Sequence, residues 1–416
     1  MREMKNSGLP WIGIIPDHWE CIRGKYILKY LSKPVKEDDG VITCFRDGEV
    51  TLRSNRREDG FTMADKEIGY QGIDIGDLVV HGMDGFAGAI GISDSRGKAS
   101  PVLNVLDTQQ NKRYIMYYLR SMAYGDVFIA MATGIRVRSC DLRWNKLANF
   151  EYLVPPIEEQ KKIAEFLDTK CSEIDALIAD IQTQIETLEQ YKRSTVIETV
   201  LKGLKPRLPT KDSKIDWVGT IPSHWNTHPM YYYFEECKHI NSLGEENNLL
   251  SLSYGKVIRK DINTNGGLLP NNFNTYNIIE KDDIVLRLTD LQNDRRSLRT
   301  GIAKERGIIT SAYVTLRATK VLNAQYFYYL LHAYDLMKVL YNMGSGVRQG
   351  LNYDELSKMM LIEPLLDEQN EIATFLDKKC SEINTCIEEK KEQIFTLEAY
   401  KKSIIFEYVT GKKEVV

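Results

Sequence analysis

The stretch EQKKIAEFLDTKCSEIDALI at residues 159–178 decides the fold, because it returns 209 residues later as EQNEIATFLDKKCSEINTCI with 13 of 20 positions identical. A second block, SGLPWIGIIPDHW at residues 7–19, returns 206 residues later as SKIDWVGTIPSHW. The sequences between these blocks have diverged. The chain of 416 residues therefore has two related halves, which keep one framework and carry two different inserts.

The composition excludes several classes of protein. The seven cysteines show no CxxC spacing, and the close pair Cys380 and Cys386 falls on helical sequence, so we expect neither a zinc site nor a disulfide framework. The N-terminal residues lack the apolar core of a signal peptide, and no run of about 18 apolar residues could span a bilayer. We expect a cytoplasmic protein without metal or membrane insertion.

Charge is unevenly distributed along the chain. The net charge is −3, but residues 21–155 carry +2 and residues 226–363 carry +1, while the repeated arms at 158–202 and 367–411 carry −4 each. An anionic ligand should therefore be met by the inserts. The acidic arms are better suited to solvent or to a protein partner.

Both arms are predicted to be long helices with a coiled-coil seam. Apolar residues recur at alternating intervals of four and three, acidic pairs at 158–159 and 367–368 occupy the first turns, and Gly203 and Gly411 end the pattern. The seam residues are Leu167, Cys171, Ile174, Ile178, Ile181, Ile185 and Leu188 in the first arm, and Leu376, Cys380, Ile383, Ile387, Lys390, Ile394 and Leu397 in the second.

The two arms are expected to pair with each other. Each arm of about 44 residues would reach roughly 65 Å, and a helix of that length with one apolar stripe needs a partner. An antiparallel pair with one insert at each end satisfies both stripes and creates an internal pseudo-twofold axis. Packing on the arm's own domain or on an identical chain remains the alternative. Lys390 stands where the first arm has Ile181, and by hypothesis it fixes the register.

Both inserts are predicted to be mixed α/β domains that share the same fold. Short apolar runs at 77–80 and 283–286 are bounded by Gly, Asp and Asn, and Tyr-rich helical stretches follow at 114–124 and 326–334. We interpret the tyrosines as core rather than as base-stacking residues. The expected division is a first domain at 1–155, a helix at 156–203, a second domain at 204–363, and a helix with tail at 364–416.

Arginines cluster in polar loops of both inserts. A guanidinium group suits phosphate and the guanine edge, although a surface charge run is commonly only solvated. The matching loops Thr-Gly-Ile-Arg and Ser-Gly-Val-Arg, at 133–136 and 345–348, point more strongly to a binding role. The candidate DNA-binding residues are Arg53, Arg56, Arg57, Arg136 and Arg138 in the first insert, and Arg287, Arg295, Arg296, Arg299, Arg348 and Gln349 in the second.

Catalytic motifs are not recognisable. Residues 91–99 resemble a phosphate-binding loop but have one residue too many between the glycines, and Ala99 stands where Ser or Thr must hold magnesium. His18 and His224 lie beside Trp at the same place in both halves, which favours a structural contact over a metal ligand or base. The chain is therefore expected to perform no chemistry.

The repeated motifs resemble those of the specificity (S, HsdS) subunits of type I restriction-modification systems. The matching features are Trp-x-Gly-x-Ile-Pro-x-His-Trp at 11–19 and 217–225, the joint sequence Glu-Gln-x-x-Ile-Ala-x-Phe-Leu-Asp-x-Lys-Cys-Ser-Glu-Ile, the copies of Leu-Glu-x-Tyr-Lys, and IVLRLTDLQNDRRSLR at 284–299. The resemblance covers nearly the whole chain.

This resemblance implies two target recognition domains, each reading one half of a bipartite, asymmetric DNA site, separated by an antiparallel coiled coil. It also implies two methyltransferase (M) subunits that bind S-adenosylmethionine, and restriction (R) subunits that use ATP and magnesium. The specificity subunit itself would have no activity and no cofactor. HGMDGFAG at 81–88 differs from RLTDLQND at 287–294, as expected if the two half-sites differ.

Two other interpretations remain open. The chain could be a coiled-coil adaptor that binds protein rather than DNA. It could also be a self-sufficient DNA methyltransferase or nuclease with an unrecognised catalytic motif.

Overall fold

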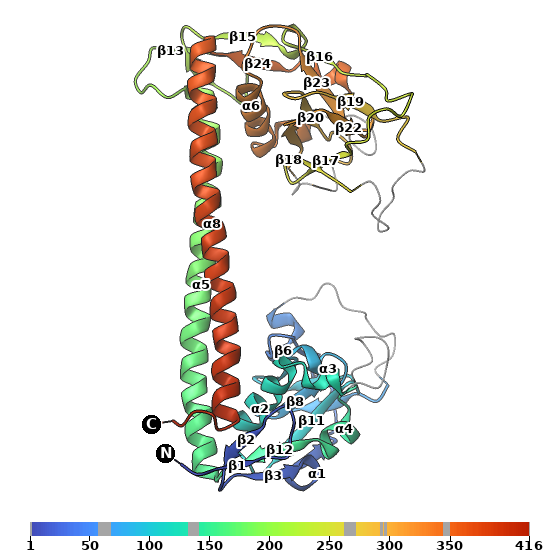
Figure 1. Ribbon diagram of the computed structural model, residues 1–416, viewed down its shortest axis with the longest axis vertical. Coiled ribbons are helices and arrows are strands. Elements are labelled where there is room, and N and C mark those ends of the chain that lie inside the picture. The colour runs from blue at the N-terminus through green and yellow to red at the C-terminus, as the bar shows by residue number, and fades with distance from the viewer. Residues whose placement is uncertain are drawn as a thin grey trace. The chain divides into compact units, whose positions relative to one another are not determined.

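The computed structural model describes residues 2–56, 68–131, 141–261, 272–291, 294, 298–343 and 350–415. The chain forms two compact units (Figure 1). Unit 1 comprises Met1–Ile181 with Lys391–Val416, and unit 2 comprises Gln182–Lys390. Each unit therefore contains one insert and one half of each long helix, so this division cuts across the four consecutive segments expected from the sequence.

Unit 1 contains an antiparallel four-stranded sheet in the order β4-β11-β8-β9 and the two-stranded ribbons β1-β2, β3-β12, β5-β6 and β7-β10. Its strands are β1 (Met4–Asn6), β2 (Ile14–Pro16), β3 (Glu20–Arg23), β4 (Leu28–Leu31), β5 (Ile42–Cys44), β6 (Val50–Leu52), β7 (Gln71–Ile73), β8 (Leu78–His81), β9 (Ile90–Ile92), β10 (Gly97–Ala99), β11 (Leu103–Thr108) and β12 (Glu151–Val154). Its helices are α1 (Gly24–Ile27), η1 (Arg53–Asn55), η2 (Gly85–Ala87), α2 (Lys112–Tyr124), α3 (Val127–Ala130), α4 (Trp144–Asn149), and parts of α5 (Ile157–Lys202) and α8 (Leu366–Val409).

Unit 2 contains an antiparallel four-stranded sheet in the order β16-β23-β20-β21 and the ribbons β13-β14, β15-β24, β17-β18 and β19-β22. Its strands are β13 (Thr210–Asp212), β14 (Thr220–Pro222), β15 (Asn226–Pro229), β16 (Phe234–Glu236), β17 (Leu250–Ser253), β18 (Lys256–Arg259), β19 (Asn277–Ile279), β20 (Ile284–Leu286), β21 (Thr300–Ile302), β22 (Gly307–Ile309), β23 (Val314–Ala318) and β24 (Met360–Glu363). Its further helices are η4 (Met230–Tyr232), α6 (Ala324–Leu336), η5 (Val339–Asn342) and α7 (Tyr353–Leu356).

The two units have the same topology. Each strand of one four-stranded sheet has a counterpart at the same place in the other sheet, and each two-stranded ribbon of unit 1 has an equivalent ribbon in unit 2. The helix that follows the sheet is 13 residues long in both units, and it begins at an asparagine cap, Asn111 or Asn323. The expected mixed α/β class and the shared fold of the inserts are thereby confirmed.

The long helices begin and end where their sequences direct. The helix α5 follows two prolines and carries Glu158 and Glu159 in its first turn, where carboxylates favour the positive end of the helix dipole. It is followed by Gly203 with φ +75°, and α8 is followed two residues on by Gly411 with φ +68°. Both values lie in the left-handed region that glycine adopts readily, so both helices stop at a residue suited to stopping them.

Within each unit, the segments of α5 and α8 lie side by side and run antiparallel (Figure 1). In unit 1, Phe166 stacks on Tyr408 with ring centroids 4.4 Å apart, and Asp175 pairs with Lys401. In unit 2, the Nζ atoms of Lys390 and Lys192 donate to Gln184 and Asn384. Higher numbers on one helix meet lower numbers on the other in both units, as an antiparallel coiled coil requires.

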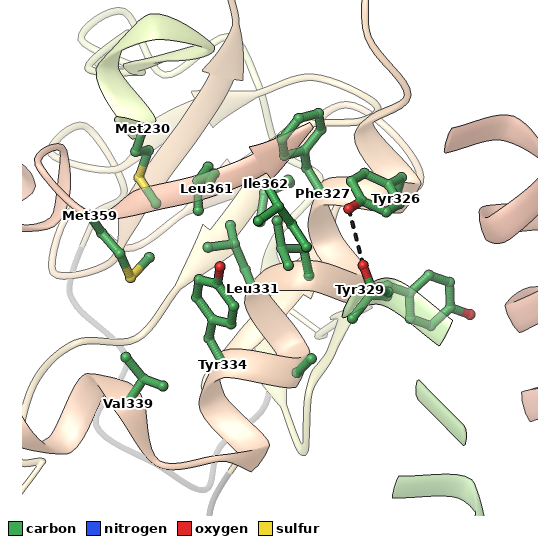
Figure 2. Close-up of a cluster of buried hydrophobic side chains, with 14 of the residues drawn as sticks. Met230, Tyr326, Phe327, Tyr329, Leu331, Tyr334, Val339, Met359, Leu361 and Ile362 are labelled. Atoms are coloured by element: carbon green, nitrogen blue, oxygen red, sulfur yellow. Dashed lines mark hydrogen bonds between the residues drawn. The ribbon is translucent and has the colours of Figure 1, made fainter. Parts of the chain in front are cut away.

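The tyrosine-rich helices are part of the core. Tyr114 and Tyr118 of α2, and Tyr326 and Tyr334 of α6, are completely buried. In unit 2 they lie with Leu331 and other apolar side chains in one cluster (Figure 2). The interpretation of these tyrosines as core residues rather than stacking platforms is confirmed.

Candidate nucleic-acid interface and helix pair

Unit 1 contains a hollow of about 760 Å³ that is rich in arginine. Its polar lining includes Arg46, Arg53, Arg56, His81 and Asp84, which come from the β5–β6 hairpin, from η1 and its C-cap, and from the end of β8 and the segment after it. Three guanidinium groups around one concavity provide the planar, multidentate donors that phosphates and guanine edges accept.

The arginines of this hollow are held by neighbouring side chains. Arg56 pairs with Asp47 at 2.5 Å and lies over the Phe45 ring at 4.2 Å, while Arg53 donates from Nε to Thr43 Oγ1 at 3.0 Å. Two of the expected DNA-binding residues therefore share one surface, and their guanidinium planes are oriented before any ligand arrives.

Arg46 belongs to the same surface, although the sequence reasoning missed it. Its side chain is 68 % exposed, and its Nη2 lies 2.9 Å from Asp84 Oδ1. The signal in the sequence that could have indicated Arg46 was its position just before Gly48. In the structure this glycine has φ +88° in the hairpin turn. The segment that carries Asp84 is organised by His81, whose Nδ1 accepts from the backbone N–H groups of Met83 and Asp84. Burial lowers the pKa of His81, so neutral imidazole, the form that can accept, is favoured.

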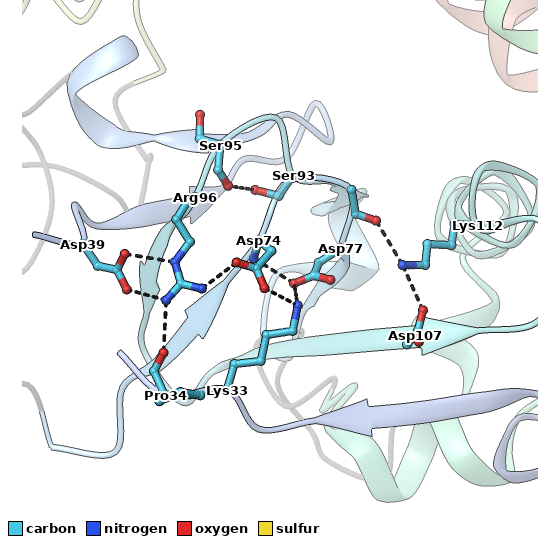
Figure 3. A network of polar contacts seen from close by, with 11 residues as sticks. Lys33, Pro34, Asp39, Asp74, Asp77, Ser93, Ser95, Arg96, Asp107 and Lys112 are labelled. Atoms are coloured by element: carbon cyan, nitrogen blue, oxygen red, sulfur yellow. Dashed lines mark hydrogen bonds and ion pairs between the residues drawn. The ribbon is translucent and has the colours of Figure 1, made fainter. Parts of the chain in front are cut away.

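A partly buried polar network joins Asp39, Asp74 and Asp77 of unit 1 to Arg96 and Lys33 (Figure 3). The Arg96 guanidinium donates to both carboxylate oxygens of Asp39 at 3.0 and 2.8 Å, and to Asp74 at 2.5 Å. Lys33 reaches Asp74 and Asp77 at 2.7 and 2.6 Å. Hydrogen bonding from Arg96 lowers the pKa of Asp39 to about 2. The stretch that resembles a phosphate-binding loop, residues 91–99, contains strand residues here and no helix start, which agrees with its rejection.

In unit 2, Arg287 and Arg299 have different environments. The Arg287 side chain is 35 % exposed, and its Nη1 lies 3.8 Å from Asp294 Oδ2, so it can contact a ligand. Arg299 is completely buried and donates to groups of its own unit. The expectation that Arg299 contacts DNA directly is therefore corrected, because a side chain without exposed surface has no access to a duplex.

Seven of the candidate DNA-binding residues lie outside the described residues. They are Arg57, Arg136, Arg138, Arg295, Arg296, Arg348 and Gln349. Their assignment remains a prediction.

The residues of the helix seam differ in burial. Leu167 and Leu376 are fully buried, and the seam residues Cys171, Ile174, Ile181, Ile185, Cys380, Ile383 and Ile387 are buried as well. Ile178, Leu188, Lys390, Ile394 and Leu397 are half-buried. The Lys390 ammonium is 2.5 Å from Gln184 Oε1 on the facing helix, so the polar seam residue has a specific acceptor.

A Trp-His-Glu joint fastens each insert to a helix start. In unit 1, Trp19 Nε1 donates to Glu159 Oε2 at 2.9 Å and His18 Nε2 lies 2.6 Å from Glu159 Oε1. In unit 2, the indole of Trp225 and the imidazole of His224 make the same contacts with Glu368, at 3.0 and 2.9 Å. The histidines are structural contacts in both units, as the sequence predicts.

Within the described residues, no cluster of three or more His, Cys, Asp or Glu side chains could hold a metal ion. Among the same residues, no helix is both long enough and apolar enough to cross a membrane.

The sequence of this chain is similar to those of known proteins. Residues 245–395 match the family model described as the type I restriction modification DNA specificity domain. Over 386 residues the chain is 26 % identical to a putative type I restriction enzyme specificity subunit, MjaX, of Methanocaldococcus jannaschii, and the match covers 87 % of each chain.

Two solved structures share the fold. A chain from a structure concerned with complex assembly and conformational transition of the type I restriction-modification system superposes with a TM-score of 0.68, covering 96 % of this chain and 99 % of that one. The HsdS subunit of Thermoanaerobacter tengcongensis gives a TM-score of 0.50 and covers 96 % and 98 %. Both are 13 % identical to this chain, so they speak to the fold alone.

Residues 245–395, most of which lie in unit 2, are thus similar to a DNA specificity domain. Over most of its length the chain is similar to specificity subunits of type I restriction-modification systems, as its repeated motifs indicate.

Proposed function

We propose that each unit reads one half of a bipartite, asymmetric DNA site through the major groove, and that the helix pair sets the gap between the halves. One observation carries this proposal. The two units share a topology, but the segments after the equivalent strands β8 and β20 are unlike, HGMDGFAG at 81–88 and RLTDLQND at 287–294. A common framework with different reading segments suits two different half-sites.

Arginine supplies the proposed DNA contacts. In unit 1 these are Arg46, Arg53 and Arg56 around the hollow, together with Arg57, Arg136 and Arg138. In unit 2 they are Arg287, Arg295, Arg296 and Arg348, together with Gln349. The exposed ion pairs of Arg46 and Arg56 cost little to exchange, because such pairs contribute only about 0–1 kcal/mol.

The helices are long enough to act as a spacer. The helix α5 has 46 residues. At ~1.5 Å per residue and ~3.4 Å per base pair, such a helix spans roughly 70 Å and limits the distance between half-site centres to about 20 base pairs. A paired helix is stiffer than a linker, so it can hold two readers in a fixed register.

The helices also provide a surface for two M subunits, which would bind S-adenosylmethionine. Large apolar side chains stay exposed on them, among them Tyr191, Phe375, Phe395 and Tyr400 at 39 to 72 %. R subunits, with ATP and magnesium, would complete the nuclease. The six described cysteines are all free, which suits the reducing cytoplasm in which we place the complex.

Insertion of one heptad into both α5 and α8 tests the spacer. The longer helix pair should widen the unread gap by about 3 base pairs, because seven residues add ~10.5 Å. Modified adenines are mapped in a host that expresses the chain with its M subunit. Both half-sites should be unchanged. An unchanged gap with altered half-sites would refute the assignment.

The same system separates the alternatives. Methylation or cleavage by the purified chain alone would favour a self-sufficient enzyme. If a bipartite duplex and a random duplex compete equally well for binding to the chain, a protein-binding adaptor is favoured.

A further inference from the structure

The segment between β20 and β21 in unit 2 folds around a buried arginine. Leu288 and Leu291 of this segment are 1 % and 0 % exposed, so they turn into the core, while Thr289 is exposed and Arg287 is partly exposed. The Leu288 carbonyl also accepts from the Leu351 N–H at 3.1 Å. The segment therefore has an inner side anchored in the protein and an outer side that is free to meet a ligand.

Arg299, at the end of this segment, uses all five of its guanidinium N–H groups internally. Nη1 donates to the carbonyls of Arg287 and Thr289 at 3.2 and 2.7 Å. Nη2 donates to the carbonyls of Asp290, at 3.1 Å, and of Asp294. Nε donates to the Tyr341 hydroxyl at 3.1 Å. Four carbonyls of one short segment thus converge on a single planar group.

The site around Arg299 is built to retain it. The Arg299 backbone N–H donates to Asp335 Oδ2 at 2.7 Å, and its guanidinium carbon lies 5.3 Å from the centre of the Tyr341 ring. Tyr341 is 7 % exposed and Asp335 is fully buried. A lysine could not replace Arg299, because three donors on a point-like ammonium cannot reach five acceptors arranged in a plane.

Unit 1 shapes the equivalent segment differently. Gly91 and Gly301 occupy matching positions on β9 and β21, so Ala89 stands where unit 2 has Arg299. There the His81 imidazole accepts two backbone N–H groups of the segment instead. The arginine-centred arrangement therefore belongs to unit 2.

We propose that Arg299 is a positioning residue for half-site recognition by unit 2. It holds the backbone at Arg287, Thr289, Asp290 and Asp294 so that Arg287 and Thr289 face the DNA, without touching the DNA itself. This inference rests on the proposed function, since it presumes that unit 2 reads a half-site.

The test compares Arg299→Lys with the unaltered chain, both in complex with M subunits. Binding is measured on the cognate duplex and on two duplexes in which one half-site is scrambled. Arg299→Lys should lower discrimination at one half-site by roughly tenfold or more, the size of effect that a lost base contact gives, and leave the other within about twofold. The affected half-site should be the one that Arg287→Ala also weakens.

Tyr341→Phe keeps the inference testable if Arg299→Lys prevents unit 2 from folding. This variant removes the acceptor of Nε and retains the ring, so a loss of about threefold is expected at the same half-site. Tyr353→Phe is the matched control, because it removes a hydroxyl that donates to the Phe234 carbonyl at 2.7 Å elsewhere in unit 2.

The outcomes distinguish failure of the positioning role from failure of half-site recognition by unit 2. Unaltered discrimination in a folded Arg299→Lys chain overturns the positioning role, and so does Tyr341→Phe behaving like Tyr353→Phe. An unaltered chain that shows no preference for any bipartite duplex overturns the proposed function instead.

Discussion

Lys401 on α8 holds Asp175 on α5 in unit 1, with its Nζ 2.7 and 2.6 Å from the two carboxylate oxygens. The same crosslink recurs in unit 2 between the repeat mates, where Lys192 Nζ donates to Asn384 Oδ1 at 2.8 Å. Donor and acceptor thus exchange helices, since the lysine lies on α8 in one unit and on α5 in the other. The acceptor is charged in unit 1 and neutral in unit 2.

Asp175→Lys should weaken the pairing of α5 and α8 in unit 1 by about 1 kcal/mol, because it places like charges at a contact that now attracts. Adding Lys401→Glu should restore most of the loss. Urea denaturation at low and high salt measures both effects. A double variant no more stable than the single one would contradict the direct pairing.

Loss of the carboxylate at the Trp-His-Glu joint should lower the free energy of unfolding by more than the Asp175→Lys change does. Glu159→Ala leaves the indole N–H of the completely buried Trp19 without its acceptor, which should cost about 1–3 kcal/mol. Glu368→Ala should act similarly through Trp225. The control is Glu158→Ala in the same helical turn, whose side chain is 74 % exposed, and a change below about 0.5 kcal/mol is expected there. Equal losses for Glu158→Ala and Glu159→Ala in thermal denaturation would argue against the joint.

Lys390 interrupts an otherwise apolar seam, and its repeat mate Ile181 is 6 % exposed. Lys390→Ile should therefore raise the stability of unit 2 by about 1 kcal/mol. If the pair of Lys390 with Gln184 selects the register, this variant should also form additional associated species in analytical ultracentrifugation. A less stable, strictly monodisperse variant would contradict both expectations.

Unit 2 should become less stable in mild acid because of His332. Burial, and next the charge of Lys192, lower the pKa of this imidazole to about 4. The unfolded chain, with an imidazole pKa of ~6.5, binds the proton first as the pH falls. The free energy of unfolding therefore falls as the pH drops from about 6.5 to about 4, the interval in which only the unfolded chain binds the proton. Between pH 7 and pH 5 the loss should be about 2 kcal/mol.

His332→Phe should remove this loss. The ring of Tyr328, stacked on His332 at 5.8 Å, can pack on phenylalanine, and the buried Nδ1 has no hydrogen-bond partner to lose within the described residues. His239→Gln, at an exposed site, should leave the pH dependence unchanged. The measurement is the denaturation midpoint as a function of pH, and a His332→Phe chain as acid-sensitive as the parent would contradict the prediction.

Local pattern was enough for the framework. Heptad spacing, acidic first turns and terminal glycines are properties of neighbouring residues, so both long helices could be predicted from the sequence. The binding surface could not. Arg299 occupies a polar stretch like that of a surface arginine, and only the folding of that stretch around it, together with Tyr341 from 42 residues further on, makes it internal. Arg46 was missed for the converse reason, because its surface forms only when the β5–β6 hairpin meets the segment after β8.

The Trp-His-Glu joint has an evolutionary consequence. In both halves, a glutamate at the start of the helix binds a His-Trp pair and so attaches the insert to the helix. A different insert that begins after the same His-Trp block and is followed by the same carboxylate would keep this attachment to the helix. Recombination at these repeated positions would then combine existing inserts into new pairs.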